Sequence, residues 1–204
     1  GHLASSAAVV RFSQDAEGNA TVELLASAGS FAVGGGVVDQ ALMRHFTAEL
    51  QAKHGADACK GAKFELRLRR VCARLKKLLS TVDQGKVDGD SVVPDADVQL
   101  TLTRGAMEGL ISEPLSALRT LITSVLASAA VSSSDLAAVE VVGGGARIPS
   151  ISEEIRRLAG NAPVTRTLDS SAAVALGAAG LARFWAGQED MPPASEEKGA
   201  DEPG

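Results

Sequence analysis

The sequence predicts a mixed α/β fold. Segments of strand character precede segments of helical character, and glycine turns lie where strands end and helices begin, at Gly34–Gly36 and Gly143–Gly145. Hydrophobic residues make up 45% of the 204 residues, which is enough to form a core, while aromatic residues make up only 3%. We therefore expect one domain, or two small subdomains, with an aliphatic, alanine-rich core.

Charge, hydropathy and cysteine content indicate which partners and ligands the chain does not bind. The formal net charge is -5 and the isoelectric point is about 5.3, so the chain as a whole does not attract nucleic acid. No apolar run reaches the roughly 18 residues that span a bilayer, so we expect no membrane partner. Cys59 and Cys72 lack metal-ligand spacing and form no disulfide framework. We interpret them as free thiols, and we expect no metal site and a cytoplasmic location.

The first part of the chain predicts a hairpin followed by two helices. Residues 7–12 and 20–26 have strand character, and the turn-forming residues DAEGN lie between them. Residues 38–53 carry apolar side chains at helical spacing. After a polar break, residues 64–79 form a second amphipathic pattern with an apolar stripe. We expect both helices to bury one face.

The middle of the chain predicts two strands and two further helices. Residues 86–93 and 98–102 have strand character and flank the turn sequence VPDAD. Thr103 suits the N-cap of a helix that begins RGAMEGL, because its hydroxyl can accept a bond from a free amide. The pair Glu113-Pro114 opens the next helix, over residues 115–129.

The last part of the chain predicts two strand–helix units. Residues 138–142 form an apolar strand that ends at the second glycine turn, and residues 148–158 form the helix that follows. Val164 lies in a short strand, and residues 170–185 form an alanine-rich helix. This order of strand, glycine turn and helix start is typical of a ligand-binding turn.

Two features of these elements carry chemistry. Each glycine turn places backbone amides at a strand-to-helix junction, where a ligand can approach closely and the helix N-terminus adds positive charge. One face of the helix over residues 64–79 carries a small residue, a cation and a hydroxyl that together could hold a nucleoside. These residues are Ala73, Lys77 and Ser80, with Lys76 beside them. From the residues alone, a tight turn without ligand and a solvated basic face remain the alternatives.

Five segments resemble segments of the seventy-kilodalton heat-shock chaperones of the DnaK type. The family's LGGEDFDNRMVNHF corresponds to VGGGVVDQALMRHF, and its nucleoside-contacting helix LRTACERAKRTLS corresponds to LRRVCARLKKLLS. Its segments SITRARFEEL, LVGGSTRIPKI and NPDEAVAYGAAVQA correspond to LTLTRGAMEGL, VVGGGARIPSI and LDSSAAVALGAAGLA. The segments keep the family's order and similar separations over residues 7–187, so the chain resembles a divergent member of this family.

The resemblance implies an actin-like ATPase fold, of the ribonuclease H-like kind, in which this chain is lobe II of the nucleotide-binding domain. Residues 1–37 and 111–187 would form a lower subdomain with a central sheet and flanking helices. Residues 38–110 would form a smaller α+β upper subdomain that closes over the base of the nucleotide. Residues 188–204 are acidic and lack apolar periodicity, so we expect a disordered tail.

The resemblance also implies which residues contact ATP or ADP. They lie on the first glycine turn, the nucleoside helix and the second glycine turn, and are Gly35, Lys76, Lys77, Ser80, Gly144, Gly145 and Arg147. Lys77 and Arg147 would flank the adenine plane. The family's catalytic groups and magnesium-binding carboxylates belong to lobe I. We therefore expect no catalytic residue in this chain, weak or absent nucleotide binding by the chain alone, magnesium only in the intact two-lobed domain, and no ATP hydrolysis by this part.

The chain departs from the family's pattern at several positions. Ala73 replaces a glutamate that would meet the ribose, Lys77 replaces a stacking arginine, and Ser171 replaces an aspartate. The family's second phosphate loop, DLGGGT, is reduced to residues 3–7, whose side chains restrict how amides wrap a phosphate. These losses favour an alternative, in which the parent is a noncatalytic pseudo-ATPase scaffold of an atypical chaperone, for example a ribosome-associated one.

The expected partners follow from the same resemblance. They are lobe I of the same domain and a nucleotide-exchange factor or co-chaperone that engages the upper subdomain, and the expected role is protein folding in the stress response. A third interpretation takes the basic helix over residues 67–77 as a target for a calmodulin-like protein or an anionic surface. The order of the matched segments already accounts for that helix, so we do not favour this interpretation.

Overall fold

The computed structural model describes residues 2–18 and 20–186 of the chain. It divides into two units, one ending at Thr167 and one beginning at Leu168. The acidic stretch predicted to be disordered, residues 188–204, lies outside the described residues. The first unit contains every described strand and every described helix except α6 (Ala173–Ala186). The mixed α/β class predicted from the sequence is confirmed.

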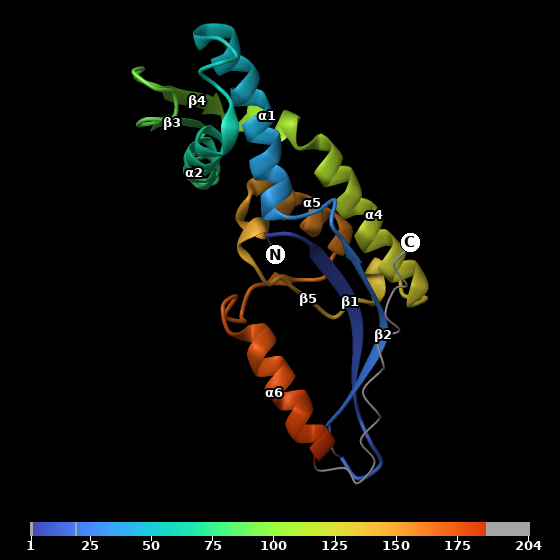
Figure 1. Cartoon of the computed structure of the whole chain (residues 1–204). Coiled ribbons are helices and arrows are strands. Elements are labelled where there is room, and N and C mark those ends of the chain that lie inside the picture. The colour runs from blue at the N-terminus through green and yellow to red at the C-terminus, as the bar shows by residue number, and fades with distance from the viewer. Residues whose placement is uncertain (1, 19, 187–204) are drawn as a thin grey trace, which may run out of the picture. The chain divides into compact units, whose positions relative to one another are not determined.

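A β-hairpin near the N-terminus packs on a helix. β1 (Ser5–Gln14) and β2 (Ala20–Ser30) pair antiparallel, as predicted, and are longer than the sequence pattern indicated. One face of the hairpin contacts α4 (Ser112–Ser128), which Figure 1 shows running alongside it. The buried residues of this contact are Val9, Leu121 and Val125. Alternating side chains of a strand point to opposite faces, so α4 covers one face of the hairpin and does not cover the other.

The main core lies between two helices and a second hairpin. α1 (Gly35–His54) packs on α2 (Gly61–Leu79), and β3 (Gln84–Asp88) pairs with β4 (Gln99–Thr103) beside α2 (Figure 1). The apolar stripes of both helices face this core, because their apolar residues recur at helical spacing. Its largest fully buried side chains are Phe46, Leu42, Leu68, Leu75, Leu79, Leu100, Met107 and Ile111. The predicted aliphatic core is therefore confirmed.

The strand predicted over residues 86–93 is wrong beyond Asp88. β3 ends there, and the chain turns before β4 begins at Gln99. Ser91 and Asp95 adopt φ angles of 58° and 53°, a left-handed conformation that cannot continue a strand. The apolar residues that suggested a longer strand, Val92 and Val93, enter the core from this turn. Burial in a turn, rather than strand pairing, accounts for their apolar character.

The next helix begins where the sequence predicts, and the one after it begins at Ser112, before the predicted start at residue 115. Thr103 caps α3 (Arg104–Leu110), and its hydroxyl accepts a bond from the Ala106 amide at 3.2 Å. Pro114 lies in the first turn of α4, where its missing amide costs no helical hydrogen bond. A short 3-10 turn, η1 (Ser133–Asp135), follows α4 and is closed by a capping box. Side-chain caps therefore mark the starts of α3 and η1, whereas α4 starts without one.

The expected central sheet is divided in this structure. β5 (Val139–Glu140) and β6 (Val164–Thr165) form a parallel pair, and η2 (Gly144–Arg147) and α5 (Pro149–Ala159) lie between them in the chain. Within the described residues, this pair, the β1–β2 pair and the β3–β4 pair are three separate sheets. Because β5 is extended over only two residues, it forms too few ladder bonds to extend the larger hairpin. The expectation of one central sheet is therefore not met in the described part of the chain.

The second unit contributes one alanine-rich helix, α6. It begins at Ala173 rather than at Ser170, because Asp169 accepts the Ser171 amide at 2.8 Å and holds a turn ahead of the helix. Its apolar residues Val174 and Leu176 are exposed. No single helix in residues 2–18 and 20–186 has both the length and the apolar composition to cross a membrane, whereas α3 and α4, bent by 64°, pass that test only as a pair.

An ion-pair cluster links α4 to α5. The Glu154 carboxylate accepts hydrogen bonds from Arg119 of α4 at 2.7 Å and from Arg157 of α5 at 2.6 Å, and its side chain is 12% exposed. The bonds from Arg157, and then those from Arg119, lower the pKa of Glu154 to about 2, because they stabilise the charged carboxylate. The cluster is therefore intact at neutral pH and opens in acid.

We predict that Glu154→Gln makes the free energy of unfolding less sensitive to acid. A carboxylate with a lowered pKa contributes its full stability above its ordinary pKa of 4.5, and this contribution is lost as the pH falls toward 2. Across that window the parent chain should lose more stability than the variant, by on the order of 1 kcal/mol. Denaturant unfolding at stepped pH measures both slopes.

The control for this experiment is Glu65→Gln. Glu65 lies on α2, and its carboxylate is exposed and has no ion pair among the residues that the structure describes. This variant should follow the parent chain at every pH. If the parent and Glu154→Gln lose stability with the same pH dependence, the cluster does not contribute as described.

Candidate functional site

The two predicted glycine turns meet in the first unit. Gly35 is the first residue of α1, and Gly145 lies in η2, just ahead of α5. A Cβ atom placed on Gly145 would lie 3.9 Å from the Gly35 amide nitrogen, so the two turns lie close together. Both turns lie at the start of a helix, where backbone amides favour negative charge. Residues far apart in the sequence therefore form one junction.

The first glycine turn is covered by the N-terminal segment. The Gly36 amide donates a hydrogen bond to the His2 carbonyl at 2.7 Å. A Cβ atom on Gly34 would lie 2.7 Å from the same carbonyl oxygen, so a side chain at Gly34 would displace the segment. Glycine is required here by close backbone approach. The Gly36 amide is bonded within the protein and does not offer itself to a ligand.

Lys76 is held at this junction by a buried ion pair. Its ammonium lies 2.7 Å from Oδ1 of Asp39 and donates a hydrogen bond to the Gly35 carbonyl at 3.0 Å. The Lys76 and Asp39 side chains are 14% and 7% exposed. The angles of the Lys76–Asp39 contact fall outside those of a hydrogen bond, so charge attraction holds it. A buried carboxylate needs such a partner, because removing an unpaired charge from water is costly.

Two neighbours of Asp39 complete this cluster. Nδ1 of His2 lies 4.0 Å from Oδ2 of Asp39, and the His2 side chain is largely exposed. Cys72, one turn before Lys76 on α2, is fully buried. Burial, and then the negative charge of Asp39, raise the pKa of the Cys72 thiol to about 12. Cys72 therefore stays protonated and acts as a small apolar core residue. Both cysteines are free, as predicted, and both are buried.

The three predicted residues of the nucleoside helix differ in their surroundings. Lys76 is engaged as described above. The Ser80 hydroxyl donates to the Lys76 carbonyl at 2.9 Å and thereby caps the end of α2. Lys77 is exposed, and it has no hydrogen bond or ion pair within the described residues. Of the three, only Lys77 presents an unengaged polar group to a ligand.

The second glycine turn presents its remaining predicted residues outward. Gly144 is exposed, with no atom within 4 Å of the position where a Cβ would lie. Arg147 is also exposed and lines a concave surface of about 540 Å³ beside α5. The junction therefore brings Gly35, Gly145 and Lys76 together, whereas no hydrogen bond or ion pair among the described residues joins Arg147 or Lys77 to them.

The sequence analysis missed Asp39, the carboxylate that fixes Lys76. It stands on the apolar side of α1, among the buried residues of that helix. A lone acidic residue within an apolar stripe, directly after a glycine turn, is a signal that a buried cation lies nearby. The sequence carried that signal, but the identity of the cation depends on how α1 and α2 pack.

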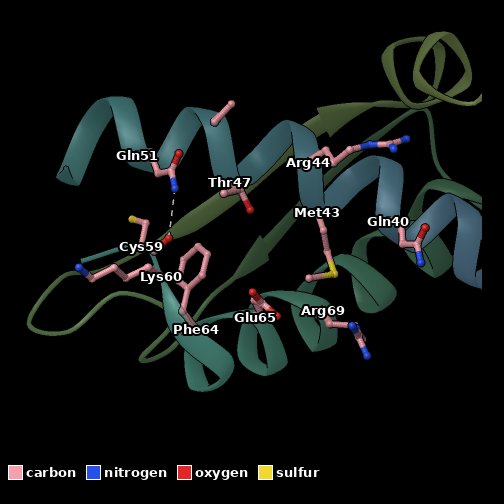
Figure 2. Close-up of a pocket in the computed structure, with 12 residues that line it drawn as sticks. Gln40, Met43, Arg44, Thr47, Gln51, Cys59, Lys60, Phe64, Glu65 and Arg69 are labelled. Carbon is pink, nitrogen blue, oxygen red and sulfur yellow. Dashed lines mark hydrogen bonds between the residues drawn. The ribbon is translucent and has the colours of Figure 1, made fainter. Parts of the chain in front are cut away.

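A second hollow lies between α1 and the start of α2. It encloses about 590 Å³ and is lined mainly by apolar surface. Figure 2 shows Met43 extending from α1 toward α2, Phe64 extending from α2 toward α1, and Gln51 bonded to the Cys59 carbonyl at 3.3 Å. Charged side chains, including Arg44, stand at its edge. This groove is separate in its lining residues from the glycine junction.

Comparison with known proteins gives a consistent set of relatives. The sequence model of the Hsp70 protein family matches residues 5–194. The chain is 32% identical to heat shock 70 kDa protein BIP3 of Oryza sativa subsp. japonica. It is 30% identical to heat shock cognate 70 kDa protein 3 of Dictyostelium discoideum. Both alignments cover 82% of the present chain. The chain is also 32% identical to heat shock protein hsp88 of Neurospora crassa, over 72% of the present chain. The present chain spans only 25% of the length of BIP3, 26% of the cognate protein and 20% of hsp88.

We predict that Lys76→Met destabilises the fold strongly, whereas Lys77→Met does not. Removing the Lys76 charge leaves Asp39 buried without its cation, which costs about 3–5 kcal/mol. The neighbouring Lys77 is exposed, so its removal should change the free energy of unfolding by at most about 0.5 kcal/mol. Urea unfolding of the two variants, matched in charge and in the residue introduced, measures the difference. Similar costs for both variants would show that Lys76 is not held as the structure indicates.

Proposed function

The chain belongs to the Hsp70 family of heat-shock chaperones, and on that premise we propose that it is lobe II of the family's nucleotide-binding domain and contributes contacts to adenosine. The single observation that carries this proposal is the junction of Gly35, Gly145 and Lys76. These residues come from three of the segments that resemble the family. Lys76, in the last turn of α2, donates to the Gly35 carbonyl, and Gly35 and Gly145 lie close together, each at or just ahead of the start of a helix. That is the backbone arrangement that nucleotide-binding turns use.

The proposed lobe has the two subdomains expected from the sequence. Residues 1–37 and 111–187 would form the lower subdomain, and residues 38–110 the upper one. The outer face of the β1–β2 hairpin supports the proposal that another part of the domain covers it, because an exposed apolar patch of this kind marks an interaction surface. Its exposed residues are Val10, Phe12, Val22 and Leu24, and they face one another across the two strands. We propose that lobe I, or another part of the same domain, covers such surfaces.

The proposed ligand is ATP or ADP, bound through its nucleoside end. Lys77 and Arg147 are the exposed predicted cations, and their stems and charged ends suit the faces of an adenine ring. Lys76 and Ser80 would shape the wall rather than bind, since both are bonded within the protein. Among the described residues, no group of three His, Cys, Asp or Glu side chains could hold a metal ion. In this proposal, magnesium would therefore be held by lobe I of the intact domain.

A second candidate function is a noncatalytic scaffold with an eroded nucleotide site. Three observations favour it. The Gly36 amide, which could bind a phosphate oxygen, donates to His2 instead, and Lys76 is paired with Asp39. Ala73 offers no carboxylate to a ribose hydroxyl. Under this alternative the fold serves as a partner surface, and nucleotide binding is absent even when the whole domain is present.

Partners and location follow from the family as proposals. Lobe I is the first partner, and a nucleotide-exchange factor or co-chaperone that engages the upper subdomain is the second. The role would be assistance of protein folding under stress. A cytoplasmic location, expected from the two unpaired cysteines, stays an expectation. Neither a nucleic-acid partner nor a membrane partner is part of the proposal.

We predict weak binding of adenosine, in the millimolar range that corresponds to about -4 kcal/mol, with ADP binding no more tightly. The phosphates should add little, because the Gly36 amide is already bonded and the half-site is open to water. NMR shift mapping with adenosine should move signals of α2 and η2. Arg147→Ala should abolish these shifts, while Lys53→Ala, a change of the same charge at the end of α1, should leave them.

One further variant sharpens this test. Ala73→Glu restores a carboxylate beside the ribose and should tighten adenosine binding by roughly 0.5–1.5 kcal/mol, the contribution of one hydrogen bond. Shifts that map to residues away from α2 and η2 would contradict the nucleoside site. Absence of nucleotide binding by the whole nucleotide-binding domain, measured by calorimetry, would favour the scaffold instead.

A further inference from the structure

Three arginines line one concave surface on the first unit. Arg147 precedes α5, Arg156 lies on α5, and Arg166 directly follows β6. They surround a hollow of about 540 Å³, together with Pro149, Ser152 and Glu153. The hollow therefore holds three positive charges and one negative charge. Its wall also includes the first turn of α5, whose amide dipoles add to the positive potential.

These arginines lack the carboxylate partners that other arginines of the chain have. Arg11 pairs with Glu23, Arg104 with Asp83, and Arg119 and Arg157 with Glu154. Within the described residues, none of the three arginines of the hollow forms an ion pair, although Glu153 lines the same surface. Like charges gathered without partners repel one another and raise the free energy of the fold. An anion bound between them would remove that cost.

Arg166 is already fixed in a binding position. Its Nη2 donates hydrogen bonds to the Ala146 carbonyl and to Oγ of Ser152, the latter at 3.0 Å. These bonds leave Nε and Nη1 of its planar guanidinium as further donors. Ser152 is only 6% exposed, and since it accepts from Arg166, its own hydroxyl hydrogen remains a donor. A rigid donor set of this kind loses little side-chain freedom when a ligand binds.

We propose that this hollow is a binding site for a phosphate group, either inorganic phosphate or the phosphoryl group of a small monoester. A doubly charged oxyanion has enough oxygens to accept bonds from several guanidinium groups, and arginine binds such groups in pairs of parallel bonds. Glu153 limits the affinity by repulsion. Arg147 lines this hollow and is also one of the proposed nucleoside contacts, whereas Arg156 and Arg166 belong to the hollow alone, so Arg156→Gln tests phosphate binding without altering the nucleoside contacts.

The test is titration of the whole chain with inorganic phosphate at constant ionic strength, maintained with chloride. Arginine Nε–Hε signals in NMR spectra should shift for Arg156 and Arg166 and saturate. Arg156→Gln should weaken phosphate binding about tenfold, the equivalent of one charge-assisted hydrogen bond. Glu153→Gln should strengthen binding, because it removes the negative charge of the hollow. A parallel titration with glycerol phosphate identifies the source, since the tighter of the two ligands is the one for which the site is suited.

The matched control is Arg157→Gln. Arg157 neighbours Arg156 on α5, and its loss changes the net charge equally but leaves Glu154 paired with Arg119. This variant should bind phosphate as the parent does. If Arg156→Gln and Arg157→Gln weaken phosphate binding equally, the effect comes from overall charge, and the proposal is wrong. The proposal is also wrong if chloride alone produces the same NMR shifts as phosphate. Arg166→Gln could disturb the turn that Arg166 holds, so Arg156→Gln and Glu153→Gln are the variants that test phosphate binding.

Discussion

The buried pair of Lys76 and Asp39 sets the arrangement of two helices and two turns. It joins α2 to the first turn of α1, and the same ammonium binds the Gly35 carbonyl. Gly35 in turn lies close to Gly145, ahead of α5. Each charge is stable away from water only while the other is present, so α1 and α2 are fixed in register at this end. Along the rest of their length, the aliphatic core around Phe46 holds them together.

This arrangement has a consequence for function. The groups nearest the glycine junction are satisfied within the protein: the Gly36 amide by His2, and Lys76 by Asp39. Lys77, the neighbour of Lys76 on α2, is exposed, and three exposed arginines line the hollow beside α5. At the junction itself, a ligand would therefore meet groups that are already bonded within the protein. In the two proposals, Lys77 serves only the adenine ring, Arg156 and Arg166 serve only the phosphate group, and Arg147 belongs to both.

Much of the fold follows from local patterns in the sequence. The first hairpin, the amphipathic helices and the Thr103 cap are each determined by residues close in the chain. The end of β3 could not be predicted, because Val92 and Val93 are apolar for burial in a turn and not for pairing. The glycine turns and Lys76 were predicted as site residues, whereas Asp39 was not. Its role depends on a contact between two helices, which no local pattern encodes.

A double-mutant cycle on Lys76 and Asp39 tests most directly the claim that this pair is structural. The free energies of unfolding of the parent, Lys76→Met, Asp39→Leu and the double variant are measured under one condition. We predict a coupling energy of about 2–3 kcal/mol, because the double variant removes the charge that each single variant leaves buried and unpaired. A coupling energy near zero, with the two single costs simply adding, would contradict this account.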